Sequence, residues 1–207
     1  GTTQVKAGRL VINGAHSGTG QVSVMTGGEL AGKGSVAGRV AVFDGSILVA
    51  GDTLINGTGL TLNNGLSMKA GSILQCPIYC NGTSSKANRI TLKGNVDIND
   101  AVLYVDMNDV SSIPDDRGFV LLSLGSATVT GTGFTQIIPE RPSPTQEWDT
   151  SLLLSKGQLF VRASVPDGIR DLQSVSRDDA PCYDLTGRRV PATSKGLYIQ
   201  NGKKVMR

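Results

Sequence analysis

The stretch Asp44-Gly45-Ser46-Ile47-Leu48-Val49-Ala50-Gly51 carries the pattern that decides the fold of this chain. A glycine is followed by one or two small or polar residues, then by leucine or β-branched residues, and then by glycine again. The same pattern recurs in Lys6–Ile12, Thr26–Gly32 and Lys69–Leu74. The anchor glycines of the four stretches are 20, 17 and 26 residues apart, at Gly8, Gly28, Gly45 and Gly71. A repeat of roughly 20 residues is typical of solenoids, whose repeats pack only on their neighbours.

Short segments between glycine-rich corners alternate apolar and other residues with a period of two, which predicts β-strands. These segments are 22–24, 39–42, 60–62, 90–92 and 102–105. Their spacing fits either a parallel β-helix or an antiparallel sandwich. The repeat length and the unequal corners favour the β-helix, because a regular antiparallel meander favours two-residue turns. We therefore predict an all-β parallel β-helix and keep the sandwich as the alternative.

The pattern predicts four segments along the chain. Residues 1–118 form the β-helix coils, interrupted at 76–88 by a protruding loop in which Pro77 lacks a backbone donor. Residues 119–164 contain three of the four phenylalanines and the only tryptophan, so we expect a cap that closes the last coil. The polar residues 165–181 are predicted to be a linker. Residues 182–207 are predicted to form a small antiparallel β tail, with a hairpin at its Asn-Gly dipeptide.

The composition argues against two classes of function. The formal net charge is +3, and no basic run with interleaved aromatic residues is present, so we predict no nucleic-acid partner. No stretch approaches the ~20 apolar residues of a membrane span, so we predict no such span. Because the chain opens with Gly1 almost inside a repeat, we expect the parent protein to extend further toward its N-terminus.

The three cysteines, Cys76, Cys80 and Cys182, are too few for a disulfide framework. They also lack the spacing and the histidine partners of a zinc site. Cys76 and Cys80 either close a small disulfide loop or pack as small buried hydrophobic residues, and we favour the second interpretation. We predict no cofactor.

Four aspartates form an acidic cluster late in the coils, at Asp97, Asp100, Asp106 and Asp109. Paired carboxylates act as acid and base in glycoside hydrolysis, which makes Asp97, Asp100 and Asp106 candidate catalytic residues. Carboxylates also bind calcium, for which Asp106 and Asp109 are the candidates. We favour a third interpretation, solvated turn residues, because a corner must fall between Asp97 and Asp106. The only histidine, His16, has just two hydroxyl residues near it in sequence, and we expect it in a surface loop.

The glycine-punctuated coils are followed by Phe119–Leu122, Gly131–Phe134, Trp148–Leu153 and Leu159–Val161. Over residues 5–163 this succession resembles autotransporter-associated β-strand repeat proteins, chiefly through the run Trp148-Asp149-Thr150-Ser151-Leu152-Leu153. The resemblance implies a right-handed parallel β-helix that serves as an extracellular passenger region.

The tail contains three short motifs in order, Tyr183-Asp184-Leu185-Thr186-Gly187-Arg188, Gly196-Leu197-Tyr198 and Asn201-Gly202-Lys203. These motifs are similar to the C-terminal sorting domains of secreted Bacteroidetes proteins. In that family the tail is read by the type IX export machinery and can be replaced by a surface anchor. The resemblance therefore implies the export machinery as a partner and a cell-surface or secreted location in a Gram-negative bacterium.

Together these observations predict a non-catalytic β-helix stalk or passenger fragment, surface-exposed or secreted, that adheres to a surface or displays an N-terminal partner domain. The alternative is a carbohydrate-active enzyme or glycan-binding module that uses an outer face of the β-helix, with a polysaccharide or surface glycan as its partner. A groove lined by three or more convergent carboxylates or basic residues would favour this alternative.

Overall fold

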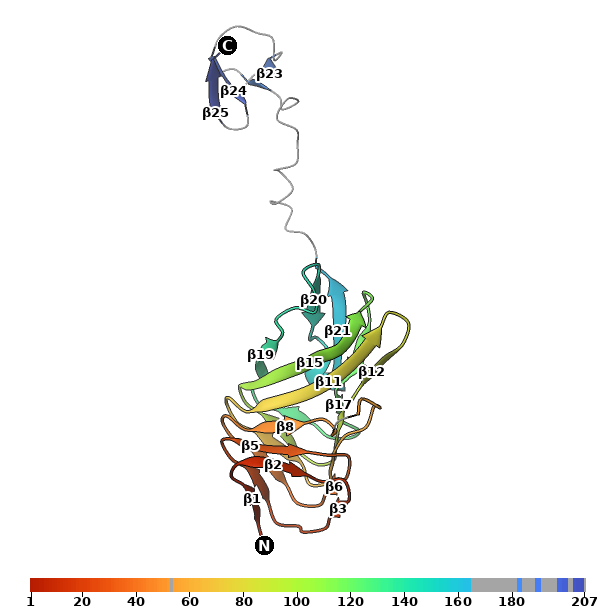
Figure 1. Cartoon of the computed structure of the whole chain (residues 1–207). Helices are drawn as coiled ribbons and strands as arrows, with labels where there is room; N and C mark the ends of the chain where they lie inside the picture. Colours follow the sequence, from red (N-terminus) through yellow and green to blue (C-terminus); the bar gives the residue numbers. More distant parts are fainter. Residues whose placement is uncertain (53, 165–181, 184–188, 191–196, 201–202, 207) are drawn as a thin grey trace. The chain divides into compact units, whose positions relative to one another are not determined.

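The computed structural model describes residues 1–52, 54–164, 182–183, 189–190, 197–200 and 203–206. The chain divides into two compact units, Gly1–Ser164 and Val165–Arg207, which are described separately. The regular structure of the first unit is β-strand apart from one four-residue helix, and most of its strands belong to three parallel sheets (Figure 1).

The three parallel sheets, named A, B and C here, collect their strands from successive passes of the chain. Sheet A contains β1 Thr3–Val5, β4 Val22–Val24, β7 Val40–Val42, β10 Leu66–Met68, β14 Val96–Ile98 and β18 Val129–Thr130. Sheet B contains β2 Gly8–Val11, β5 Gly28–Ala31, β8 Ile47–Val49, β11 Ile73–Asn81, β15 Ala101–Ser112 and β19 Phe134–Ile138. Sheet C contains β3 Ala15–His16, β6 Ser35–Val36, β9 Thr61–Leu62, β13 Ile90–Leu92 and β17 Leu122–Ser123. The chain enters the sheets in the order A, B, C on each full pass, as in a parallel solenoid.

The direction of the strands distinguishes the parallel β-helix from the antiparallel sandwich, the two architectures that fit the sequence. The pairs that build sheets A, B and C are parallel, so the antiparallel-sandwich alternative is wrong. The predicted strands 22–24 and 90–92 coincide with β4 and β13, and the other three overlap β7, β9 and β15. The period-two alternation therefore located the strands of the parallel sheets.

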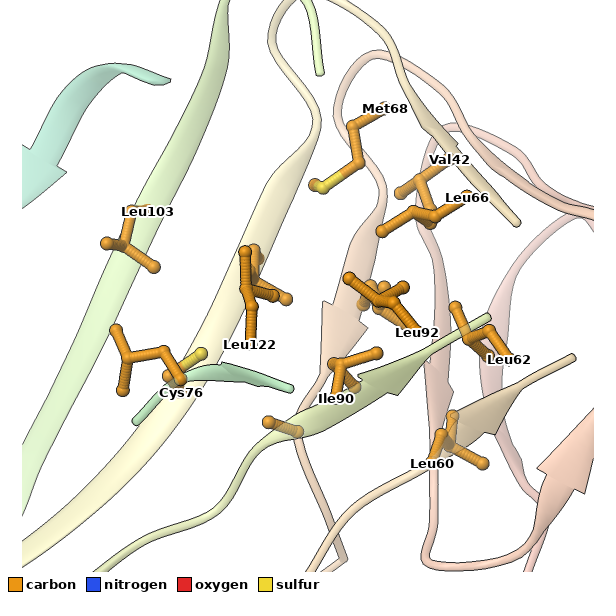
Figure 2. Packing of buried hydrophobic residues seen from close by; sticks show 14 of the residues in the cluster. Val42, Leu60, Leu62, Leu66, Met68, Cys76, Ile90, Leu92, Leu103 and Leu122 are labelled. Atoms are coloured by element: carbon orange, nitrogen blue, oxygen red, sulfur yellow. The ribbon is translucent and has the colours of Figure 1, made fainter. Parts of the chain in front are cut away.

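The core consists of aliphatic side chains stacked from one pass to the next. In sheet A, Val40 lies between Val22 and Leu66 in the ladder, and all three side chains are fully buried. Figure 2 shows side chains from the three sheets pointing into a common interior, among them Leu66, Leu92 and Leu103. Burying one such side chain contributes about 1.5–3 kcal/mol. Because the interior between three sheets is narrow, it is filled mainly by aliphatic side chains such as valine and leucine.

Left-handed glycines form the corner between sheets A and B. Gly8, Gly27, Gly45 and Gly71 have φ values of 74°, 81°, 66° and 74°, which residues with a side chain rarely adopt. The N–H of each of the first three donates to the carbonyl of the next, at 3.2, 3.1 and 3.2 Å. Three of the four predicted anchors occupy this corner, whereas the predicted Gly28 follows the corner glycine Gly27 by one residue.

The predicted loop at 76–88 is wrong, because most of this segment is paired strand. β11 continues to Asn81 and then pairs antiparallel with β12 Ser85–Ala87, so the segment is a β-hairpin added to sheet B. Pro77 lies opposite Asp106 of β15, and the register shifts between Pro77 and Tyr79. This irregularity accommodates the missing N–H of proline inside a paired strand.

An antiparallel cap sheet follows the last passes. It consists of β16 Gly118–Val120, β21 Gln158–Ala163 and β20 Gln146–Asp149, with helix α1 Leu153–Lys156 between β20 and β21. Phe119 is buried, and Trp148 packs against the core while its Nε1 donates to the carbonyl of Pro139 at 2.9 Å. The segment that begins the predicted cap supplies strands to two sheets, β16 to the cap and β17 to sheet C.

The second unit contains a four-stranded antiparallel sheet in the order β23-β22-β24-β25. The strands are β22 Cys182–Tyr183, β23 Arg189–Val190, β24 Leu197–Gln200 and β25 Lys203–Met206. Gln200 pairs with Lys203, so β24 and β25 form the predicted hairpin, although its turn residues lie outside the described part of the chain.

Candidate functional site

A groove of about 380 Å³ lies on the outer side of sheet B. Strands β2, β5, β8, β11 and β15 all contribute side chains to it, together with the segment that follows β8. The lining residues are Arg9, Glu29, Val49, Asp52, Ile55, Gln75, Pro77, Asn88, Asp106, Asn108 and Asp109. Because neighbouring strands are in register, residues from five passes meet here although they are up to 100 residues apart in sequence.

At one end of the groove, Arg9 contacts both Glu29 and Asp52. It lies opposite Glu29 in the β2–β5 ladder, and its Nε contacts Glu29 Oε1 at 2.9 Å. Its Nη2 also donates to the carbonyl of Asp52 at 3.4 Å. The Asp52 carboxylate lies 3.5 Å from Lys33 Nζ and accepts the N–H of Leu54 at 3.3 Å. This end of the groove is therefore an ion-paired network that joins two strands to the following segment.

The other end of the groove is built from the long strands β11 and β15. Gln75 Nε2 donates to Asp106 Oδ2 at 3.2 Å, and the N–H of Asn108 donates to Asp106 Oδ1 at 3.1 Å. Asp109 lies opposite Tyr79 in the same ladder. Amide and carboxylate groups alternate along this end, an arrangement suited to the hydroxyl groups of a sugar.

Asn88 fixes the segment after β8 against the groove. Its side chain is buried, and its Oδ1 accepts the N–H groups of Asn56 and Gly57, each at 3.1 Å. Its Nδ2 donates to the carbonyl of Leu54 at 2.9 Å. A buried amide with three such bonds to one segment determines where that segment lies. Asn88 could not be predicted from the sequence, because its partners are more than 30 residues away and no motif surrounds it.

The structure divides the four predicted aspartates into two groups. Asp106 and Asp109 line the groove, whereas Asp97 and Asp100 do not. Asp97 lies on β14 of sheet A and accepts a bond from Thr130 Oγ1 at 3.4 Å. Asp100 lies at the corner after β14, with φ 49°, and its Oδ1 accepts the hydroxyl of Thr132 at 2.8 Å. The candidate catalytic residues Asp97, Asp100 and Asp106 are thus distributed over sheet A, a corner and sheet B.

The groove contains four carboxylates, those of Glu29, Asp52, Asp106 and Asp109, against the guanidinium of Arg9. The first three are held by the bonds described above. Within residues 1–52 and 54–164, no three histidine, cysteine or acidic side chains lie close enough together to hold a metal ion. Four carboxylates therefore line the groove, but no three of them lie close enough together to bind one ion.

His16 and the two coil cysteines lie away from the groove. His16 Nε2 is 3.3 Å from Thr3 Oγ1, and its Nδ1 is buried. Cys76 and Cys80 are free and buried on one strand. Four residues of extended strand separate their Cα atoms by about 13 Å, well beyond the roughly 7 Å that a disulfide spans. The interpretation of these cysteines as packed hydrophobic residues is confirmed, and burial raises the pKa of the Cys76 thiol.

A second, smaller hollow of about 270 Å³ lies between the β11–β12 hairpin and β16. Two cationic side chains line it, those of Lys86 and Arg89, together with Ser85 and the apolar Phe119. This hollow has the opposite charge to the groove, and it could not be predicted from the sequence because the two cations belong to no basic run.

The sorting-like residues of the tail lie only in part within the described structure. Tyr183 is on β22 and is exposed, Tyr198 is on β24 and Lys203 is on β25. The remaining predicted tail residues lie outside the described residues, namely Asp184, Leu185, Gly187, Arg188, Gly196, Asn201 and Gly202.

Comparisons with known proteins gave no assignment: no protein-family model matches the chain, and no curated protein matches it. In the described residues, no helix has the length and apolar character needed to cross a membrane.

Proposed function

We propose that residues 1–164 are a right-handed parallel β-helix that works as a non-catalytic stalk or passenger module. The order A, B, C on each pass and the parallel pairing between successive passes support the β-helix. Right-handedness rests on a physical preference, because crossovers between parallel strands of one sheet are right-handed in about 98% of cases. The resemblance to passenger repeats supports the same handedness.

The mechanical role is supported by the continuous ladder of sheet A. The backbone ladder of sheet A continues without a register shift from β1 through β14, and its inner side chains stack as one aliphatic column. Each pass is therefore held to the next by three sets of backbone hydrogen bonds and by close packing. Such a structure transmits force along its length and holds whatever is attached at either end at a fixed distance, as adhesion or display of a partner domain requires.

The spacer role is tested by pulsed electron paramagnetic resonance on the full chain. Spin labels on unnatural amino acids at the exposed positions Gln4 of β1 and Thr135 of β19 avoid the native cysteines. A rigid spacer gives a narrow distance distribution that persists in moderate urea until cooperative unfolding. A broad distribution in buffer would contradict the spacer role.

For the tail, we propose recognition by the type IX export machinery, which would place the protein on the cell surface or outside the cell. The support is the order of the three motifs and the antiparallel sheet formed by β22–β25. The test fuses residues 165–207 to a periplasmic reporter in a Bacteroidetes host and measures reporter outside the cell. The same fusion with residues 201–207 removed is the control, and equal export of both would contradict the proposal.

The second candidate function is glycan binding in the groove on sheet B. The observation that favours it is the alternation of carboxylate, amide and guanidinium groups along one groove. Because four carboxylates oppose one guanidinium, acidic polysaccharides are disfavoured there, and neutral or amino-sugar glycans fit better. The carboxylates of Glu29, Asp52 and Asp106 are already engaged by neighbours, which favours binding over proton transfer.

A glycan array, paired with an assay for released reducing or unsaturated ends, distinguishes these functions. Groove variants Asp106→Asn and Asp109→Asn are compared with Asp97→Asn, an equivalent change on sheet A. Binding lost only in the groove variants would establish the glycan-binding module. Product release that is abolished in a groove variant would make the protein an enzyme, and silence in both assays would leave the spacer role.

A further inference from the structure

The smaller hollow, between the β11–β12 hairpin and β16, is bordered by two strand edges. In the described part of the first unit, β12 pairs only with β11, and β16 is the end strand of the cap sheet, which has the order β16-β21-β20. Residues of both strands line the hollow, together with Gly57 and Arg89. The free edges of the hairpin and of the cap therefore face the same space.

The register of the hairpin shows which groups of β12 face the hollow. The N–H of Asn88 donates to the carbonyl of Pro77 at 3.0 Å, so these two residues form a hydrogen-bonded pair. In an antiparallel ladder, hydrogen-bonded pairs alternate with pairs that are not hydrogen-bonded. Lys86, two residues along, therefore directs its backbone groups to β11. The N–H and carbonyl groups of Ser85 and Ala87 point to the other side, and both residues line the hollow.

The register of the cap gives the same result for β16. The N–H of Val161 donates to the carbonyl of Arg117 at 2.9 Å, so Arg117 and, two residues along, Phe119 direct their backbone groups to β21. Gly118 and Val120 direct theirs away from β21, and both line the hollow. The two edges thus present backbone donors and acceptors to one space.

The edges are too close together for a further strand to fit between them. Cα atoms of β12 and β16 approach within 8 Å, whereas a strand paired with both would hold them about 9.6 Å apart. No ladder joins the two strands directly. The volume of about 270 Å³ lies just below the roughly 300–1,000 Å³ of pockets that hold drug-sized ligands. The hollow therefore suits one small polar group and excludes a paired peptide strand.

Two cations line this hollow without an anion beside them. Lys86 and Arg89 contribute to the lining, and no acidic side chain does. Every ion pair among the described residues involves Arg9, Lys33 or Arg162, which leaves the charges of Lys86 and Arg89 without a partner. A lysine on an edge strand also discourages strand addition, but Arg89 lies beyond the end of β12. The charge of the hollow therefore favours an anionic ligand.

We propose that this hollow binds an acidic sugar, namely one uronic-acid residue of a polysaccharide. Its carboxylate accepts charge-assisted hydrogen bonds from Lys86 and Arg89. Its hydroxyl groups both donate and accept, which matches the mixed N–H and carbonyl groups of the two edges. A bare inorganic anion would satisfy the cations but would leave the edge carbonyls facing negative charge. This site is separate from the groove on sheet B, which has the opposite charge.

The test titrates the full chain with trigalacturonate and follows the amide signals by NMR. We expect saturable shifts at the four residues whose backbone faces the hollow, Ser85, Ala87, Gly118 and Val120. The methyl ester of the same trisaccharide, which lacks the charges, should give no shift at these amides.

Variants of the two cations show whether the shifts report this site. Lys86→Gln and Arg89→Gln should each weaken binding about tenfold, because each removes a charge-assisted hydrogen bond. Both side chains are exposed, so these changes should leave the fold intact. Lys93→Gln is the matched control, since Lys93 is exposed but does not line the hollow. Asp106→Asn, in the groove on sheet B, should also leave binding unchanged.

Several outcomes overturn the proposal. Absence of shifts at the four amides, or binding that both glutamine variants retain in full, means that the hollow does not hold the carboxylate. Equal binding of the methyl ester means that charge is not recognised. Inorganic sulfate that binds as tightly as trigalacturonate reduces the site to a general anion site, and tighter binding of a triglutamate peptide assigns it to acidic peptides.

Discussion

The N–H of Gly71 donates to the carbonyl of Asp100 at 3.1 Å, and both residues have left-handed backbone, with φ of 74° and 49°. Asp100 therefore occupies, in its own pass, the corner that glycine occupies in the four earlier ones. The position explains why an aspartate from the predicted acidic cluster lies away from the groove. Aspartate is among the few residues with a side chain that adopt this conformation readily.

If Asp100 is a corner residue, Asp100→Gly should keep the stability of the chain, whereas Asp100→Val should lower it by about 1–2 kcal/mol because valine is strained at positive φ. Urea unfolding followed by Trp148 fluorescence measures both. Asp97→Val is the matched control, because Asp97 lies within β14, where valine is favourable. Equal losses in the two valine variants would contradict the corner role.

The buried side-chain amide of Asn88 predicts that its removal destabilises the chain. Asn88→Ala removes three hydrogen bonds and leaves the N–H groups of Asn56 and Gly57 without their acceptor, so the chain should lose about 2–3 kcal/mol. Amide exchange at Asn56 and Gly57 should accelerate more than exchange in β4. The exposed Asn95→Ala is the control, and an equal effect there would contradict a specific role of Asn88.

Glycine spacing and corner length favoured the parallel sheets over the sandwich, and period-two alternation located their strands, because each pass repeats the same local constraints. They predicted β4 and β13 to the residue, but they missed the continuation of β11 through Pro77. A proline argues against a paired strand, and only the longer neighbour β15 makes the irregular pairing favourable.

The groove was less predictable than the fold. Asp106 and Asp109 were identified as candidates, whereas Arg9, Glu29 and Asn88 were not. Which residues meet on an outer face depends on the register between passes of unequal length, and that register is set by packing throughout the core. A cluster in sequence, such as Asp97 to Asp109, was divided by the corner at Asp100.

Burial of Cys76 predicts a pH dependence of stability. Burial raises the pKa of the thiol, so the folded chain keeps a proton that the unfolded chain loses above its pKa of about 8.5. Stability should therefore fall as the pH rises above this value, by up to about 1.4 kcal/mol per pH unit. The difference between the original chain and Cys76→Val, measured by urea unfolding from pH 7 to 10, isolates this residue from the tyrosines and lysines.

The same burial predicts chemical inertness. In a Cys182→Ser chain, a thiol reagent should find no rapidly reacting thiol in the native state and two after unfolding. Absence of the two thiols after unfolding, restored by a reductant, would mean that Cys76 and Cys80 form a disulfide.

Asp149 should titrate at unusually low pH. Hydrogen bonds from the side chain and N–H of Ser151, and then from Arg162, lower the pKa of Asp149 to about 2. Its contribution to stability is present above the unfolded value of about 3.9 and is lost as the pH falls toward 2. Carbon-detected NMR should give a midpoint near 2, which Ser151→Ala raises and Ser164→Ala leaves unchanged. A midpoint near 4 in the original chain would contradict these bonds.

Gly157 joins the cap to the last passes and cannot carry a side chain. Its φ is 70°, its N–H donates to the carbonyl of Leu153 at 3.0 Å, and a Cβ would lie 1.9 Å from the carbonyl oxygen of Leu122. Gly157→Ala therefore combines backbone strain with displacement of a backbone segment, and we expect a loss of about 3 kcal/mol.

Gly125→Ala separates these two causes. Gly125 also has positive φ, at 54°, but a Cβ there would have no atom within 4 Å, so only the strain of about 1 kcal/mol applies. Urea unfolding of both variants should give a difference of about 2 kcal/mol, which measures how firmly Leu122 is held against the cap. Equal losses would mean that Leu122 and its neighbours move aside without cost, and that the cap does not hold the last passes in place.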